Sequence, residues 1–328
     1  MVCSICKKKV TDSGHIIYHN HDYYSNEEFE IVYCISQEMA ATVIPDPKIF
    51  DVAKYYPEIY YGSNNQRFNI FIEYAIVFFR KLRANFIQRV SQKKTGSVLD
   101  IGCGRGIMLS ILKNRGWKVT GTEYTDMSSR ASRENLGNDI IISKNILNEN
   151  LRENFDVITL FHVLEHVPDP DAYFGLFAEK LTKDKNSILI IEVPNISSWQ
   201  FKIAKGSWIY LEAPRHLFHF SGKALENLAG KHGFSVSYKS TFSLEFGYFG
   251  MIESLFNTII PSKNSLFHLL RKDTTRSTYN ARSVFLKFSI LILLIPVTIL
   301  SIVLETMAVL SGKGGVVRVV FKKKDLGY

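Results

Sequence analysis

The sequence is poor in the features that mark several protein classes. Four cysteines in 328 residues are too few for a disulfide scaffold, and there is no internal repeat and no low-complexity tract. The first ten residues, MVCSICKKKV, have no apolar core and no small-residue cleavage site. We therefore expect no secretory signal and an enzyme that stays in the cytosol, where cysteines serve as thiols or metal ligands.

Acidic residues are scarce in one region only. The formal charge is +9, and between residues 261 and 328 eleven lysines and arginines stand against three acids. The rest of the chain is nearly neutral. Because this basic region surrounds the longest apolar run, it indicates an anionic membrane surface as the partner. A protein groove for nucleic acid would need basic and stacking residues along a whole binding face, so we expect no nucleic acid.

The stretch SVLDIGCGRGIMLSILKNRGWKVTGTE carries the main chemical signal. Residues 97–101 form a short apolar run, typical of a buried strand, and residues 107–112 continue at helical spacing until Gly116. A second strand is expected over 117–122, ending on Glu123. This order predicts a β-α-β nucleotide-binding unit.

The glycine spacing in this unit selects among nucleotides. Gly102, Gly104 and Gly106 give G-x-G-x-G, and Ile107 takes the place of the third glycine of a dinucleotide fingerprint. With Asp100 the pattern is D-x-G-x-G-x-G, which resembles motif I of the class I S-adenosylmethionine (SAM) dependent methyltransferases. The resemblance extends over most of the chain and points to the branch of sugar and quinone methyltransferases. It implies a Rossmann-like α/β fold with a seven-stranded sheet.

The resemblance also implies a cofactor site. In this family SAM would contact Asp100, Gly102, Cys103, Gly104, Gly106 and Glu123. Asp100 would orient the SAM amino group, the glycines would admit its methionine part, and Glu123 would accept both ribose hydroxyls in a charge-assisted contact. The alternative is a glycine turn that only reverses the chain.

Further family-like segments follow. Strands are expected over 140–146, 155–161 and 187–195, and Asn145 stands near the place where the family often has an acid for adenine. The segment HVLEHVPDP is very like a signature of the branch, which would set Phe161 and His162 beside the cofactor. HVLEH also fits a zinc-protease motif, but Pro168 and Pro170 end its helix at once.

The segment GSWIYLEAPRHLFHFS resembles the family's PRHLxHFS segment. Methyl transfer from a sulfonium needs alignment and, for a hydroxyl, a base. His216 is the candidate base, because imidazole titrates near neutral pH, with Tyr210 and Glu212 as orienting residues. His219 is the weaker alternative, and a His216 that only holds the loop to the next helix remains open.

The N-terminus resembles a degenerate zinc ribbon. Cys3-x-x-Cys6 and Cys34 supply three ligands, a second C-x-x-C is missing, and His15, His19 or His21 would have to complete a Zn²⁺ site. A metal-free hairpin is the alternative. We expect this segment and a linker over 1–62, then an amphipathic helix over 68–90.

The run FSILILLIPVTILSIVL, residues 288–304, contains seventeen uncharged residues. As a helix it covers about 26 Å, short of the ~30 Å hydrocarbon core, and Pro296 is expected to interrupt it. Expected strands at 234–242 and 316–322 pair antiparallel in the resembling fold, so the chain between them must leave and return at one end of the sheet. We therefore expect a helical insertion over 249–310 that enters one leaflet without crossing it.

The methyltransferase domain would then comprise residues 63–248 and 311–328. A spanning pair of helices, 249–260 with 284–304, and a core or dimer helix are the alternatives to an insertion that dips into the membrane.

The sequence thus predicts a SAM-dependent methyltransferase at the cytoplasmic face of the inner membrane. It would methylate a hydroxyl, less readily a carbon, of a sugar or lipid-linked intermediate in polysaccharide biosynthesis. A prenylated quinone precursor is the alternative acceptor. A dinucleotide-dependent oxidoreductase and a non-catalytic membrane scaffold are the alternatives of other classes. The acceptor atom and the oligomeric state stay open.

Overall fold

The computed structural model describes residues 3–11, 14–22, 24–45, 51–56, 70–124, 126–143, 146–151, 153–260, 264–270 and 282–324. The chain forms two compact units, each assembled from three segments. The seven-stranded unit comprises residues 70–193, 222–240 and 318–328, and the four-stranded unit comprises 1–69, 194–221 and 241–317. Residues 249–310 fall in the same unit as the N-terminal segment.

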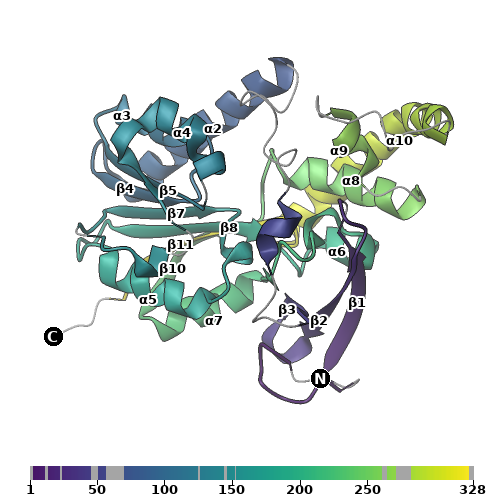
Figure 1. Ribbon diagram of the computed structural model, residues 1–328, viewed down its shortest axis with the longest axis horizontal. Coiled ribbons are helices and arrows are strands. Elements are labelled where there is room, and N and C mark those ends of the chain that lie inside the picture. Colours follow the sequence, from purple (N-terminus) through teal and green to yellow (C-terminus); the bar gives the residue numbers. More distant parts are fainter. Residues whose placement is uncertain are drawn as a thin grey trace. The chain divides into compact units, whose positions relative to one another are not determined.

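The seven-stranded unit contains the expected Rossmann-like sheet (Figure 1). Its strands are β4 (Ser97–Ile101), β5 (Lys118–Glu123), β6 (Ile140–Ile142), β7 (Val157–Phe161), β8 (Ile188–Pro194), β10 (Phe234–Ser240) and β11 (Val316–Lys323). They lie in the order β10-β11-β8-β7-β4-β5-β6. β6, β5, β4, β7 and β8 pair in parallel, and β10 pairs antiparallel with β11. The predicted fold class and the predicted antiparallel last pair are both confirmed.

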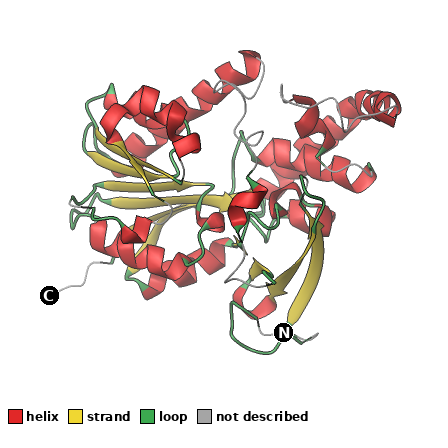
Figure 2. Cartoon of the chain, viewed as in Figure 1, coloured by secondary structure: helices red, strands yellow, loops and turns green. Residues whose placement is uncertain are grey.

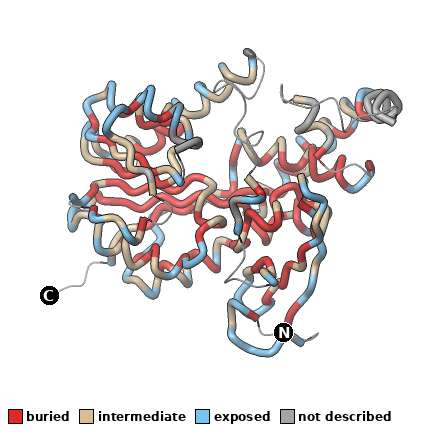
Figure 3. Tube along the Cα trace, in the orientation of Figure 1, coloured by how far each residue is buried: buried red, intermediate tan, exposed pale blue. Residues whose placement is uncertain are grey.

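Helices cover both faces of this sheet (Figures 1 and 2). They are α2 (Ile70–Ser91), α3 (Ile107–Lys113), α4 (Asp126–Leu136), α5 (Pro170–Lys180) and α7 (Gly222–Lys231). Every residue of β7 and β8 is buried, as expected for apolar strands of a sheet that is covered on both sides (Figure 3). The apolar residues of β7 and β8 therefore form the core that supports the loops at the ends of these strands.

The four-stranded unit has an antiparallel sheet in the order β1-β2-β3-β9. Its strands are β1 (His15–His21), β2 (Glu28–Cys34), β3 (Met39–Thr42) and β9 (Phe218–His219), and its helices are α6 (Trp199–Ala204), α8 (Gly247–Ile259), α9 (Ser265–Leu270) and α10 (Arg282–Leu310). Short 3₁₀ helices in the chain are Ile35–Gln37, Val52–Tyr55, Gly137–Asp139, Ile146–Asn148, Leu164–His166, Lys205–Ser207 and Ile209–Leu211.

Helix α10 runs without a break from Arg282 to Leu310, with Pro296 inside it. The expectation that Pro296 interrupts the helix is therefore wrong. Proline removes one backbone hydrogen bond and bends a helix, but packing on both sides of it can hold the turns together. Here Ile290 and Val297, on either side of the proline, both pack into one apolar cluster with α8.

Polar contacts anchor the far end of α10. The carboxylate of Glu305 is buried and accepts hydrogen bonds from Gln200 Nε2 (2.8 Å) and from the backbone N–H of Gly315 (2.9 Å). A Cβ at Gly315 would lie 2.0 Å from Gln200 Nε2, so only glycine fits there. The last turns of α10 are thus fixed to α6 and to the segment that leads into β11.

Candidate functional site

The glycine turn after β4 has the backbone that its motif requires. Gly102, Gly104 and Gly106 all have positive φ, at 67°, 58° and 69°. A Cβ on Gly102 would lie 2.5 Å from Val163, and one on Gly106 would lie 2.8 Å from Leu136. A Cβ on Gly104 meets no described atom within 4 Å, so the turn is closed on two sides and open at Gly104.

Two acids flank this turn at the carboxyl ends of parallel strands. Glu123 ends β5, and its Oε1 accepts a hydrogen bond from the backbone N–H of Gly104 at 2.5 Å. Asp100, in β4, is buried and accepts from Thr159 Oγ1 at 2.6 Å. Burial raises the pKa of Asp100 to about 7, although Thr159 and Arg83 act in the opposite direction. The open side of the turn at Gly104 would admit the methionine part of SAM. The buried Asp100 is suited to its amino group, and Glu123 at the end of β5 is suited to its ribose.

Cys103 faces the sheet behind the turn. A Cβ on Gly121 of β5 would lie 2.7 Å from its sulfur, so Cys103 packs where β5 has no side chain. Burial raises the pKa of this thiol well above its usual range, with Asp100 and Glu123 acting in the same direction. Cys103 therefore supports the turn as an apolar group. Asn145, the expected neighbour of adenine, lies outside the described residues.

The end of β7 holds the next two predicted cofactor residues. Phe161 is the last residue of β7, and the guanidinium of Arg83 lies 4.5 Å from the centre of its ring. His162 has a positive φ of 58°, and its ring nitrogens lie 3.6 Å and 3.2 Å from the carboxylates of Glu165 and Glu192. Burial opposes a charged ring, but the two carboxylates outweigh it and raise the pKa of His162 to about 9.

Glu192 is a residue of the site that the sequence analysis missed. Its fully buried carboxylate is held by Arg83 Nη2 (3.1 Å) from α2 and by Arg318 Nε (2.6 Å) from β11. Burial raises the pKa of a carboxyl, but Arg318, Arg83 and His162 together hold it well below its usual range. A signal was present: Glu192 is the only charged residue in the apolar stretch ILIIEVP.

The predicted catalytic residues lie in the four-stranded unit. His216 is buried, and its Nδ1 donates to the carbonyl oxygen of Tyr210 at 2.8 Å, because a carbonyl can only accept. In the neutral tautomer with this hydrogen on Nδ1, the ring lone pair is on Nε2. His219 is also buried, in β9, with Nε2 3.4 Å from Thr42 Oγ1.

Tyr210 and Glu212 orient His216 through their backbone and not through their side chains. The Tyr210 hydroxyl donates to the carbonyl oxygen of Phe246 at 2.6 Å. The Glu212 carbonyl accepts from the His216 backbone N–H at 3.1 Å, while its carboxylate lies 3.5 Å from Arg215 Nε. The backbone of the loop therefore holds the imidazole of His216 in place. Whether His216 is catalytic stays a prediction.

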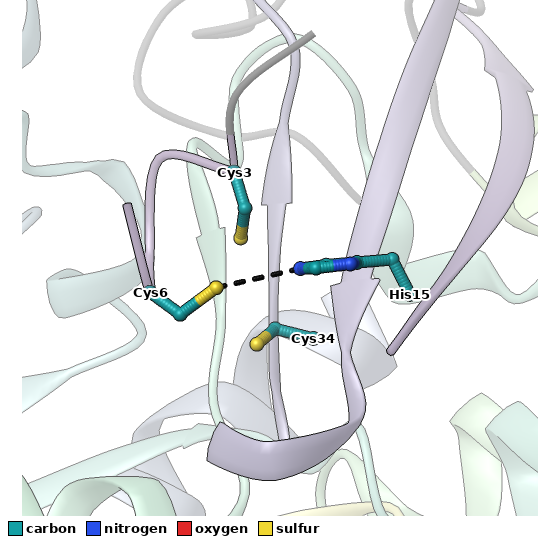
Figure 4. Close-up of side chains that lie close together, drawn as sticks. All are labelled: Cys3, Cys6, His15 and Cys34. Atoms are coloured by element: carbon teal, nitrogen blue, oxygen red, sulfur yellow. Dashed lines mark hydrogen bonds between the residues drawn. The ribbon is translucent and has the colours of Figure 1, made fainter. Parts of the chain in front are cut away.

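A second cluster lies at the N-terminus of the four-stranded unit (Figure 4). Cys3, Cys6, Cys34 and His15 each offer one ligand atom, and these atoms all lie within 4.8 Å of one another. A hydrogen bond from the backbone N–H of Lys8 is the largest of several effects that lower the pKa of the Cys6 thiol to about 6. The three predicted cysteines are thus together, and His15 joins them.

Comparison with known proteins gives the chain a family. The model of a methyltransferase domain matches residues 71–239. A ubiquinone biosynthesis O-methyltransferase of Nitrosospira multiformis is 34% identical over 141 residues, which are 41% of this chain and 59% of that protein. Its counterpart in Idiomarina loihiensis is 29% identical over 141 residues, 41% of this chain and 58% of that protein. The chain thus spans about three fifths of these curated relatives.

Solved structures with similarity include a putative sarcosine dimethylglycine methyltransferase from Galdieria sulphuraria. Its TM-score is 0.46 at 16% identity, covering 76% of this chain and 86% of that one. Coclaurine N-methyltransferase bound to N-methylheliamine and S-adenosylhomocysteine has a TM-score of 0.44 at 16% identity, covering 74% of this chain and 70% of that one.

The buried Asp100 predicts a pH-dependent affinity for SAM. The positive amino group of SAM favours the ionised carboxylate, so SAM binding would lower a pKa that is about 7 in the free protein. Affinity should therefore be constant above pH 7 and fall by about tenfold for each unit below it. Titration calorimetry between about pH 5 and 8 measures this. Asp100→Asn should bind more weakly with no such slope, and a flat profile in the unmodified protein would contradict the assignment.

Proposed function

The chain belongs to the methyltransferase-domain family, and from this membership we propose that it transfers a methyl group from SAM to a hydroxyl oxygen of a membrane-resident acceptor. A prenylated phenol, as in quinone synthesis, is the first candidate and a lipid-linked sugar the second. The sequence analysis put the sugar first. The names of the curated relatives support the reverse order, although they match only part of this chain.

The exposed face of α10 is the observation that carries the membrane part of the proposal. One face of the helix packs on the protein through Ile290, Val297, Ser301, Glu305 and Ala308. The other face is exposed and, apart from Thr306, apolar, and it includes Leu291, Ile292, Ile295, Ile299, Leu300, Ile302, Val303, Met307 and Leu310. A helix at a water surface carries polar residues there, so this face suits lipid.

The same packing favours a helix that lies in one leaflet. Among the described residues, the stretch Ile290–Leu310 has the length and composition of a membrane span. However, if α10 crossed the membrane, α8 would have to enter it as well, because the two helices pack together. The thirteen residues of α8 cover only about 20 Å, less than the ~30 Å hydrocarbon core. The eight excess positive charges between residues 261 and 328 add attraction to the anionic inner leaflet. A cytoplasmic enzyme bound to the membrane surface could then meet a lipid-soluble acceptor.

The chemistry follows from the buried imidazole. SAM supplies a methyl group activated by its sulfonium. His216 would accept the acceptor's hydroxyl proton at Nε2 as the oxygen bonds to the methyl carbon and the carbon–sulfur bond breaks. The proton then leaves to solvent. Tyr210 and Glu212 keep the ring in place through the contacts described above.

An acceptor panel tests the function. The purified chain in lipid nanodiscs, given SAM, should methylate a prenylated catechol on oxygen faster than a polyprenyl-linked sugar. His216→Asn should reduce turnover by about 10²–10⁴-fold at unchanged SAM affinity, as expected for loss of a general base. His232→Asn, at the end of α7, is the matched control. Preferred methylation of the sugar would reverse the order of acceptors, and loss in His219→Asn alone would reassign the base.

The exposed face of α10 predicts how the protein binds vesicles. Replacing Ile295, Ile299 and Ile302 by Gln should remove about 1 kcal/mol of apolar burial each and weaken binding to phosphatidylglycerol vesicles by about 100-fold. Flotation on a density gradient measures the bound fraction. The control replaces Ile16 and Ile17, exposed apolar residues of β1, and should float like the unmodified protein. Equal flotation of both variants would exclude the α10 face as the contact.

A further inference from the structure

The N-terminal cluster has the composition and spacing of a complete metal site. Ligand atoms at the corners of a tetrahedral zinc site are about 3.8 Å apart, given zinc–sulfur distances of about 2.3 Å. The four ligand atoms of Cys3, Cys6, His15 and Cys34 all lie within 4.8 Å of one another, and Cys6 Sγ lies 3.4 Å from His15 Nε2. A small inward movement of the side chains would reach the tetrahedral spacing.

Strand register selects the histidine that the sequence left open. His15 of β1 is the direct partner of Cys34 on β2, whereas His19 and His21 pair with Glu30 and Glu28. Residues four apart on a strand are separated by about 13 Å, too far for the same metal ion. His19 instead lies 3.2 Å from Glu28 on the exposed side of the hairpin.

The backbone around the first two cysteines is shaped to hold sulfur ligands. Cys3 N–H donates to the Lys8 carbonyl at 2.8 Å and Lys7 N–H to the Cys3 carbonyl at 2.9 Å, which folds residues 3–8 into a tight turn. Lys7 takes the left-handed conformation that closes it. The turn brings Cys3 and Cys6 into one cluster with His15 and Cys34.

We propose that Cys3, Cys6, His15 and Cys34 bind one Zn²⁺ in a closed structural site. Three thiolates and an imidazole are the donors that zinc prefers, and four protein ligands leave no position for a substrate. Binding releases the thiol protons to solvent. The site therefore contributes to folding and takes no part in the methyl transfer.

Zinc binding requires one local exchange. The backbone N–H of Thr11 donates to His15 Nδ1 at 3.3 Å, which places the ring hydrogen on Nε2. With zinc on Nε2 that hydrogen moves to Nδ1, and the Thr11 contact is lost. The contact between His15 Nε2 and Cys6 Sγ is replaced as well, so two long hydrogen bonds are exchanged for four metal–ligand bonds, and the balance favours the metal.

The site would stabilise the sheet to which the His216 loop is attached. At the opposite end of β1, Asn20 Nδ2 donates to the Gly206 carbonyl (3.0 Å), and Asp22 lies 2.6 Å from Arg215 Nη1 in a fully buried ion pair. On β3, Thr42 Oγ1 donates to the His216 carbonyl at 2.6 Å. Loosening β1 and β2 would remove the ion pair of Arg215 with Asp22 and displace the loop.

Metal analysis of the purified chain tests the proposal. We expect about one zinc per chain by mass spectrometry, and the intense thiolate-to-metal absorption of a tetrahedral site after exchange with Co²⁺. Cys6→Ser, Cys34→Ser and His15→Asn should each lose most of the metal. His19→Asn and His21→Asn are matched controls on the same strand and should retain it. A chain that takes up no zinc when refolded with it, or metal loss in His19→Asn with retention in His15→Asn, would overturn the assignment.

A second measurement separates this site from the proposed function. Cys34→Ser should unfold at a lower temperature and be cut faster by protease within residues 3–45, while its SAM affinity stays within a few fold of the unmodified protein. Neither readout depends on methyl transfer, so the metal site can stand if the proposed acceptor fails. Unfolding and proteolysis that match the unmodified protein would show that the cluster has no structural role.

Discussion

The buried carboxylate of Glu192 is the interaction on which the seven-stranded unit depends most. It joins Arg83 of α2, Arg318 of β11 and His162 at the end of β7, three segments that are far apart in the sequence. Removing one partner from a buried ion pair typically costs about 3–5 kcal/mol, because the remaining charge has no water around it. Arg83 also lies over the ring of Phe161. The geometry beside the glycine turn is therefore set by one charge in an otherwise apolar strand.

A related principle holds in the four-stranded unit, where buried polar contacts join segments that the chain delivers separately. Asp22 from the N-terminal segment neutralises Arg215, and Gln200 binds Glu305 of α10. The His216 loop, the small sheet and the apolar helices α8 and α10 thus belong to one body. The loop of the proposed base His216 and the exposed apolar face of α10 lie in the same unit, which suits the proposed membrane-resident acceptor.

What could be predicted from the sequence follows from how local the cause is. The glycine turn was predictable, because three positive φ angles demand glycine within five residues, and the seven-stranded sheet with its antiparallel last pair followed from the resemblance. The charge of Glu192 in an apolar strand was a local signal, but its partners depend on which distant residues the sheet brings alongside. The same holds for the choice of His15 over His19 and His21 in the proposed metal site. The prediction that Pro296 interrupts the helix was wrong, because packing of α10 against α8 outweighs the local loss of one backbone hydrogen bond. Tyr210 and Glu212 contact His216 through backbone atoms that any residue supplies, so their orienting role stays a prediction.

The central claim is that the D-x-G-x-G-x-G turn with Glu123 binds SAM. Titration calorimetry of the purified chain with SAM and, separately, with NADH tests it most directly. We predict one SAM per chain and no NADH, with affinity for SAM lowered by about 10- to 150-fold in Glu123→Ala, which corresponds to about 1.5–3 kcal/mol for a charged hydrogen-bond acceptor. Binding of NADH without binding of SAM would contradict the account.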